Sequence, residues 1–381
     1  MIAITTLRVP YAYLPEQFDP DKSLGRDILR DIADLMRSGD YTLGNWVTKF
    51  ETSIGAAYNV RHCVGVNSGT DALVLAMRAL GIRDGATVLT APNTFPATVG
   101  AILALRARPF FVDVGADYQL DYDQAVHRRV SAAIPVHLTG LARYYQAIWP
   151  LVINDAAQAI GAEWAGVSVT NFAHVSCFSL HPLKNVHGAG DGGFITTNDD
   201  ALAKELRLLR NHGLLSRDYV GLAGYNSRLD SIQAIFAWHN LKLVDEINNK
   251  RRETARRYDE AFNSAFYVRD PDNPAARKYF LVQLPPRPTQ ATQVFHTYVI
   301  QVDQRSDLIK FLGARGIEAK IHYPVPCHLQ PGFSFLGYKR GDFPVCESQA
   351  DRILSLPIHE YLTDDQIDWV IESVIAFYRD R

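Results

Sequence analysis

Between about residues 60 and 200 the chain alternates short apolar runs with segments of helical periodicity, and this alternation limits the possible folds more than any other feature. Several of the runs are continuously apolar, which is typical of strands that are covered on both faces. Strand–helix alternation over this length predicts an α/β fold with a large, doubly wound, mostly parallel seven-stranded sheet. The predicted strands are Cys63–Val66, Thr87–Ala91, Pro109–Val114, Ala132–His137, Leu151–Asn154, His174–Phe178 and Phe194–Thr197.

After about residue 240 the pattern becomes that of a smaller unit. The last helix is expected to begin at Thr363, where Gln366 completes a capping box. We therefore expect a large domain over residues 1–240, which includes an N-terminal arm, and a small C-terminal α+β domain over residues 241–381. Within the small domain the predicted elements are the strand His296–Val302, the helix Ser306–Ala314 and the strand Ile317–His322.

The composition argues against several classes of partner. A formal net charge of −2 provides no basic field, so we expect neither nucleic acid nor a membrane surface as a partner. The four cysteines are scattered and form no CxxC pair, which favours reduced thiols in a cytoplasmic protein. The first ten residues lack the basic region and apolar core of a signal peptide.

Residues suited to ligand binding recur where the predicted parallel strands end. Ligands of open α/β sheets bind beyond the carboxyl ends of the strands, so side chains at five such ends predict one shared site. These positions are Ser68-Gly69-Thr70, Thr94-Phe95, His137, Asp155 and Ser179.

Lys184 and Asp155 indicate the chemistry of this site. Lys184 comes shortly after the hydroxyl of Ser179 and before the glycine-rich stretch 188–193, and a lysine so placed can hold an aldehyde cofactor covalently. Asp155 ends a buried apolar run, where a carboxylate can keep a pyridine nitrogen protonated. Taken singly, a solvated lysine and a turn-forming aspartate are the commoner roles of these residue types. Together they predict chemistry based on pyridoxal 5′-phosphate (PLP).

The segment Ser68-Gly69-Thr70-Asp71 opens the first helix of the sheet region. Gly69 permits a close backbone approach, and the free N–H groups of Thr70 and Asp71 face an anion along the helix dipole. Ordinary N-capping by Ser68 or Thr70 is the alternative interpretation. With Ser179 and Lys184 downstream, we expect a phosphate cup.

Several further residues have more than one interpretation. Gln158 is placed to reach the ring hydroxyl of the cofactor or the substrate, and Phe95 either stacks on the ring or belongs to the core. His181 and His187 flank Lys184 but lack a third ligand at metal spacing, so no metal site is expected. His322-Tyr323-Pro324 and the segment 328–331 form a proline-containing loop that is either a structural turn or a contact for a polar substrate.

The order and spacing of these segments make the chain similar, over nearly its whole length, to the DegT/DnrJ/EryC1/StrS sugar aminotransferases, a branch of the fold type I PLP enzymes that have the aspartate aminotransferase-like fold. The segments that carry the resemblance are 44–51, Ser68–Leu73, Asn93–Thr98, Pro135–Gly140, Asp155–Ala159, Ser179–Asn185, Arg210–Gly213, Gly224–Asp230, His322–Pro324, His328–Pro331 and Leu354–Pro357.

The resemblance implies a role for each matching residue. Lys184 would carry PLP and transfer the proton, and Asp155 would pair with the ring nitrogen. Gln158 would contact the ring hydroxyl, and Phe95 would lie over the ring. The phosphate would be held by Gly69, Thr70 and Ser179.

The resemblance also implies a homodimer with shared active sites, because Asn226 would reach the cofactor phosphate of the neighbouring subunit. His322 and His328 match a loop that the family uses near the sugar nucleotide. His187 stands where relatives often have a small residue, and we expect it to lie near the substrate. Asn154 stands where many relatives have Glu.

The expected reaction is transfer of an amine from an amino acid, L-glutamate by expectation, to a nucleotide-linked keto sugar, with pyridoxamine 5′-phosphate as the intermediate carrier. Transamination of a keto-cyclitol or another cyclic ketone remains an alternative. Dehydratase relatives have histidine in place of the lysine, so Lys184 argues against dehydration. A catalytically silent homologue with a regulatory role is the alternative from a different class.

Overall fold

The computed structural model describes residues 7–145, 149–266 and 281–379, so residues 1–6 of the expected N-terminal arm lie outside the described residues. The chain has an α/β fold. Three helices, α1 (Leu14–Gln17), α2 (Ser23–Ser38) and α3 (Asn45–Tyr58), precede the first strand. Within the described ranges, no helix combines the length and apolar character needed to cross a bilayer.

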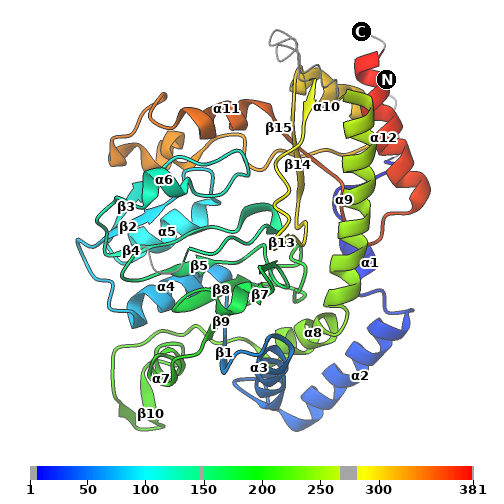
Figure 1. The fold of residues 1–381 in the computed structure, drawn as a ribbon. Helices are drawn as coiled ribbons and strands as arrows, with labels where there is room; N and C mark the ends of the chain where they lie inside the picture. The colour runs from blue at the N-terminus through cyan, green and yellow to red at the C-terminus, as the bar shows by residue number, and fades with distance from the viewer. Residues whose placement is uncertain (1–6, 146–148, 267–280, 380–381) are drawn as a thin grey trace.

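Two sheets lie at the centre of the first half of the chain (Figure 1). One has the order β1 (His62–Val66), β9 (Gly193–Thr197), β8 (Val175–Ser179) and β5 (Ile153–Asp155). The other has the order β3 (Arg108–Phe111), β2 (Thr87–Thr90) and β4 (Ala132–Ala133). All seven strands overlap the predicted ranges. β9 is antiparallel to both of its neighbours, whereas β5–β8, β2–β3 and β2–β4 are parallel pairs.

The two sheets meet at an interrupted ladder instead of forming the single seven-stranded sheet that the sequence predicts. Isolated parallel bridges join Ala133 to Val152 and Val136 to Asp155. Ala133 donates its N–H to Leu151, and the next donor along the ladder would come from Pro135. Because proline has no N–H, the hydrogen-bonded ladder breaks there.

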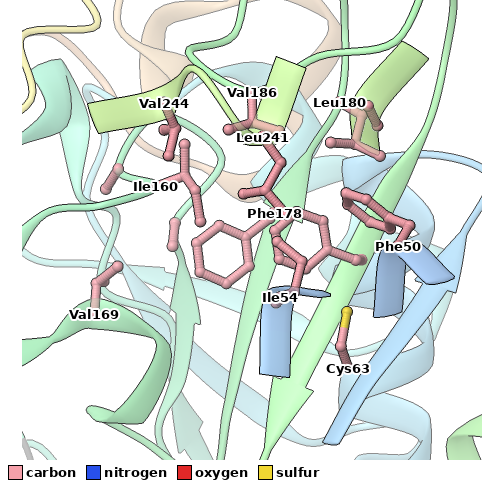
Figure 2. Close-up of a cluster of buried hydrophobic side chains, with 14 of the residues drawn as sticks. Phe50, Ile54, Cys63, Ile160, Val169, Phe178, Leu180, Val186, Leu241 and Val244 are labelled. Atoms are coloured by element: carbon pink, nitrogen blue, oxygen red, sulfur yellow. The ribbon is translucent and has the colours of Figure 1, made fainter. Parts of the chain in front are cut away.

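Helices cover both faces of these strands, as the doubly wound pattern predicts. Figure 2 shows one face, where Phe50 and Ile54 of α3 pack on Phe178 of β8, together with residues of α8 (Ser231–Leu241). Alternate strand residues, such as Val64 and Ile195, point to the opposite face. There they pack against α4 (Gly69–Ala79), α5 (Pro96–Ala104) and α7 (Asp200–Leu209).

The C-terminal part is built on an antiparallel sheet of β12 (Val282–Gln283), β14 (Tyr298–Val302) and β15 (Ile353–Leu356). It packs with α9 (Val244–Phe266), α10 (Arg305–Ala314) and α12 (Asp364–Arg379). The capping box before α12 is confirmed, because the N–H groups and side chains of Thr363 and Gln366 bond reciprocally at 3.0 and 3.3 Å. The predicted strand at 317–322 is wrong, since that segment forms only isolated bridges and β15 pairs with β14 instead.

The chain crosses between its two halves more than once. The domain boundary expected at residue 240 therefore stays a prediction. The segment before and within α11 (Pro344–Arg352) returns to the first half, beside α6 (Tyr122–Ala125) and β3 in Figure 1. There the N–H groups of Val345 and Cys346 both donate to the carboxylate of Asp113, at 2.9 Å. Val9, from the N-terminal arm, is buried in the C-terminal core.

Short elements complete the fold. A small antiparallel sheet has the order β13 (Ala291–Thr292), β6 (Glu163–Trp164) and β7 (Val167–Ser168), and β10 (Leu214–Ser216) pairs with β11 (Tyr219–Val220) as a hairpin. Within the described ranges, three-residue 3₁₀ turns occur at Leu138–Gly140, Val169–Asn171 and Cys327–Leu329, and a 3₁₀ helix of 6 residues spans Pro331–Leu336.

Candidate active site

A pocket of about 350 Å³ opens at the carboxyl ends of β1, β2, β5 and β8. It lies where the strand order predicts a ligand site. Most of the predicted site residues share its lining, although they are far apart in the sequence. These residues are Gly69, Thr70, Phe95, His137, Asp155, Gln158, Ser179, Lys184 and His322.

Asp155 is a buried carboxylate at the last position of β5. Its Oδ2 accepts a hydrogen bond of 2.7 Å from the hydroxyl of Thr98, and its Oδ1 accepts one of 3.2 Å from the N–H of Ala157. Desolvation raises the pKa of Asp155, while both hydrogen bonds and the charge of Lys184 act in the opposite direction. The carboxylate is therefore held in place beside a cation, as a partner for a protonated ring nitrogen should be.

Lys184 follows a tight turn that closes when its own N–H donates to the carbonyl of His181 at 2.8 Å. Its half-buried side chain lines the same pocket as Asp155. Desolvation lowers the pKa of Lys184 to about 8, and the negative charge of Asp155 partly offsets this effect. The uncharged, nucleophilic form of the amine is consequently accessible closer to neutral pH than in an ordinary lysine.

The start of α4 forms a cradle for an anion. The Ser68 side chain caps the helix by accepting from the N–H of Asp71 at 3.1 Å, so the N–H groups of Gly69 and Thr70 remain directed out of the helix end. A Cβ at Gly69 would lie 2.8 Å from Cβ of Ser179, so only glycine lets Ser179 approach this closely. Ser68 therefore caps the helix, and Gly69 and Thr70 remain available as the predicted phosphate cup. The two interpretations thus concern different residues of one turn.

Gln158 is oriented by its neighbours. Its Oε1 accepts from the backbone N–H of Thr139 at 2.9 Å, so the amide nitrogen faces the pocket and lies 3.4 Å from the hydroxyl of Tyr323. Thr139 has φ +64°, an unusual conformation for a β-branched residue, which aims its N–H at Gln158. The side chain is therefore presented to the pocket as a hydrogen-bond donor.

Phe95 lies at the mouth of the pocket, not in the core. Its side chain is 53% exposed, and its ring centroid is 5.5 Å from that of Tyr323. An aromatic ring this open on one side is available to stack on a planar ligand.

The predicted histidines separate into two groups. His322 lines the pocket, and its Nδ1 bonds the hydroxyl of Ser355 at 2.9 Å. Burial and the neighbouring Lys184 and Lys320 lower the pKa of His322 to about 4. His137 also lines the pocket, and burial lowers its pKa to about 4, so both rings are neutral near pH 7.

His328 and His187 do not have the predicted substrate-facing positions. His328 is buried away from the pocket lining, and its Nε2 pairs with Glu347 at 2.9 Å. His187 is buried against Asn240 and Phe18. In each ring Nε2 is bonded in the protein interior by a side chain from another segment. The two histidines are close in sequence to Lys184 and His322, which do line the pocket, but they do not line it themselves.

Asn226 and the glycine-rich stretch after Lys184 were also predicted to belong to the site. Asn226 is exposed, is bridged to Asn211 and does not line the pocket of its own chain. The glycines after Lys184 approach another side chain, because a Cβ at Gly188 would lie 2.6 Å from Oε1 of Gln233. Helix α8, which carries Gln233, explains this part of the glycine-rich stretch.

Sequence reasoning assigned no role in the site to three residues that shape it, Thr98, Thr139 and His296. Thr98 and Thr139 lie in segments that were recognised, but their partners Asp155 and Gln158 are distant in the sequence. Tyr323 and His296 line the pocket from the C-terminal half. A hydroxyl one turn into a helix that begins at a strand end is the signal that would have identified Thr98.

Taken together, the pocket suits PLP. An amine of lowered pKa, a buried carboxylate, an open aromatic ring and a helix N-terminus beside a serine are what an aldehyde, a pyridine ring and a phosphate require. Lys184, Asp155, Phe95 and the Gly69–Ser179 cradle supply these groups from separate elements. Among the described residues there is no cluster of three or more side chains suited to a metal ion.

Comparison with known proteins gives a consistent result. A sequence model of the DegT/DnrJ/EryC1/StrS aminotransferase family matches residues 22–375. A pleiotropic regulatory protein from Geobacillus stearothermophilus is 37% identical, with 98% of this chain and 99% of the relative aligned. A UDP-N-acetyl-3-dehydro-α-D-glucosamine 3-aminotransferase from Acidithiobacillus ferrooxidans is also 37% identical, over 94% of this chain and 95% of the relative.

Among solved structures, Streptomyces venezuelae DesV in complex with a ketimine intermediate superposes with a TM-score of 0.89. It is 33% identical, and the superposition covers 98% of this chain and 99% of DesV. With the family match, the whole-length relatives and the pocket all in agreement, this chain belongs to the DegT/DnrJ/EryC1/StrS aminotransferase family of PLP-dependent enzymes.

Proposed function

We propose that this chain is an aminotransferase that moves an amine from L-glutamate to the keto group of a nucleotide-linked sugar in deoxyaminosugar biosynthesis. The observation that carries the proposal is the placement of Lys184 and Asp155 on the wall of one pocket, each affecting the ionisation of the other. Relatives named for UDP-linked and dTDP-linked sugars support the substrate class.

PLP, when bound, supplies a carbonyl that takes up an amine and a ring that accepts electron density. The chain's own residues do the rest. Lys184 presents an amine that accepts and returns the proton exchanged at the substrate carbon. Asp155 holds a proton on the ring nitrogen, and Gln158 donates its amide N–H groups toward the ring hydroxyl. The α4 N-terminus and Ser179 bind the phosphate.

The regulatory alternative is favoured by one observation, namely that the Geobacillus relative is called a pleiotropic regulatory protein. A silent homologue needs no amine of lowered pKa opposite a buried carboxylate, and here both are in place. Amine transfer therefore explains more of the pocket than ligand sensing does.

We further propose a cytoplasmic homodimer in which Asn226 reaches the phosphate site of the partner subunit. Its exposed position outside its own pocket supports this role. The four buried cysteines, all free thiols, support a reducing compartment. Mixing inactive Lys184→Ala subunits with inactive Asn226→Asp subunits tests the shared site, because hybrid dimers would then contain one intact site. No recovery of activity on mixing would contradict it.

The function itself is tested by adding L-glutamate to purified PLP-loaded protein. We expect the visible absorbance of the bound cofactor to disappear as 2-oxoglutarate forms. Keto sugars linked to dTDP or UDP should then restore that absorbance, with the amino sugar identified by mass spectrometry. A keto-cyclitol as the only acceptor would favour the alternative substrate, and PLP binding without amine uptake would favour the regulatory role.

A further inference from the structure

His296 lies on the pocket wall and has no role in the assignments above. It precedes β14, so it reaches the site from the C-terminal half of the chain. Its Nδ1 lies 3.4 Å from Oδ1 of Asn185, the residue that directly follows Lys184. The side chain that contacts His296 thus belongs to the residue next to the reactive lysine.

The orientation of Asn185 follows from two backbone carbonyls, which can only accept hydrogen bonds. Asn248 donates from Nδ2 to the carbonyl of Ile160 at 3.2 Å, so its Oδ1 must face Asn185. Asn185 then donates from Nδ2 to that Oδ1 at 2.7 Å and to the carbonyl of Val294 at 3.0 Å. Oδ1 of Asn185 can therefore only accept, and the ring nitrogen beside it is Nδ1 of His296.

An acceptor at Oδ1 requires a proton on Nδ1 of His296. In a neutral imidazole the other nitrogen, Nε2, then carries a lone pair and no proton. Because Nδ1 is engaged by Asn185, Nε2 is the ring nitrogen left to face the pocket. A chain of three side chains, from Asn248 through Asn185 to His296, therefore selects the tautomer.

We propose that Asn248 and Asn185 lock His296 as a neutral acceptor that positions the protonated amine of Lys184 during amine transfer. The inference deepens the proposed function and rests on it. When Lys184 takes a proton from the substrate carbon it becomes an ammonium with three donors. Nε2 of His296 accepts one of them and keeps the amine aimed at the reacting atom, so His296 is a positioning residue.

The surroundings of His296 keep it uncharged. Desolvation sets its pKa well below the ordinary histidine value, and the charges of Lys184, Arg251, His322 and His181 act in the same direction. A cationic imidazole would repel the lysine ammonium. A neutral one can accept a hydrogen bond from it.

Two variants test whether the hydrogen-bond acceptor at Nε2 matters for the rate, apart from the volume of the imidazole ring. His296→Asn keeps a donor near Nδ1 for Asn185 but has no atom at the place of Nε2. His296→Gln reaches the place of Nε2 with an amide oxygen. We expect His296→Asn to slow the single-turnover reaction with L-glutamate by about 10- to 100-fold, the effect of losing a hydrogen bond to a charged group. His296→Gln should restore most of that rate, with the KM for L-glutamate little changed in both variants.

A second measurement uses the apoprotein and needs no activity. Nitrogen-15 NMR of histidine-labelled protein reports which ring nitrogen carries the proton, and the signal missing from His296→Gln identifies the residue. We expect the Nδ1–H tautomer and no titration between pH 6 and pH 9. The Asn185→Leu variant, which removes the acceptor for Nδ1, should shift the ring toward the Nε2–H tautomer.

The outcomes are distinguishable from failure of the function. A proton on Nε2 in the wild-type protein, a cationic ring at pH 7, or His296→Asn and His296→Gln reacting at equal rates would each overturn the inference. Absence of amine uptake by the wild-type protein would instead overturn the proposed function. Circular dichroism and PLP loading of both variants confirm that the fold is retained.

Discussion

The hydroxyl of Thr98 lies 2.7 Å from Oδ2 of Asp155 and donates to it. Thr98 stands in the first turn of α5, and Asp155 ends β5, so this contact joins a helix to the strand whose end carries the pocket-lining carboxylate. The hydroxyl of Thr94, 2.6 Å away, bonds Thr98 in turn. A line of two threonines thus keeps a buried carboxylate oriented and favours its charged form.

Replacing Thr98 by valine should impair the enzyme most at low pH. The Thr98 hydrogen bond lowers the pKa of Asp155, so its loss raises that pKa, and the charged carboxylate disappears at a higher pH as the solution is acidified. The acid limb of the pH–rate profile should therefore move to higher pH. The Thr98→Ser variant keeps the hydroxyl and serves as the control. If Thr98→Val and the wild-type protein show the same acid limb in the pH–rate profile, this role of Thr98 is contradicted.

The Lys184 amine should titrate near pH 8. Burial lowers its pKa to about 8, so the reactive amine increases as pH rises through that value. Acylation of Lys184 in the apoprotein, followed by mass spectrometry across pH, measures the midpoint. In Asp155→Asn the midpoint should move to lower pH, because the carboxylate raises the lysine pKa. A wild-type midpoint at the ordinary value of about 10.4 would refute the expected desolvation.

The glycine at position 69 should be required for cofactor binding. In Gly69→Ala the new Cβ would meet Ser179 at 2.8 Å and push the helix end away from the serine. We expect PLP affinity to fall at least about tenfold and stability to fall by about 1–3 kcal/mol. Gly100→Ala, in the interior of α5 with nothing near its Cβ, is the matched control and should be neutral or slightly stabilising. Spectroscopic titration with PLP and thermal unfolding measure both effects.

His328 should act on stability, not on substrate binding. Its buried pair with Glu347 ties the 3₁₀ turn Cys327–Leu329 to α11. Breaking this pair with His328→Gln or Glu347→Gln should each cost about 1–3 kcal/mol of unfolding free energy. The KM for the keto sugar should change little in either variant. A raised KM at unchanged stability would restore the substrate-contact interpretation of His328.

Much of the fold follows from local patterns. The seven strands of the two central sheets were located from short apolar runs, and the start of α12 from Thr363 and Gln366. Such signals are local because a strand or a cap needs only its own few residues to be recognised. The strand at 317–322 was misassigned because its pairing partner, which decides whether a short run becomes a strand, is a distant segment.

The sequence by itself determined that polar residues gather at strand ends, and with Lys184 and Asp155 this was enough to predict a PLP site in one pocket. Only the tertiary structure decided which neighbours act on them. Thr98 meets Asp155 and Asn185 meets His296 across long stretches of chain, while His328 turns inward to Glu347. The physical reason is that a hydrogen bond depends on distance and direction between two groups, and packing of separate elements sets both.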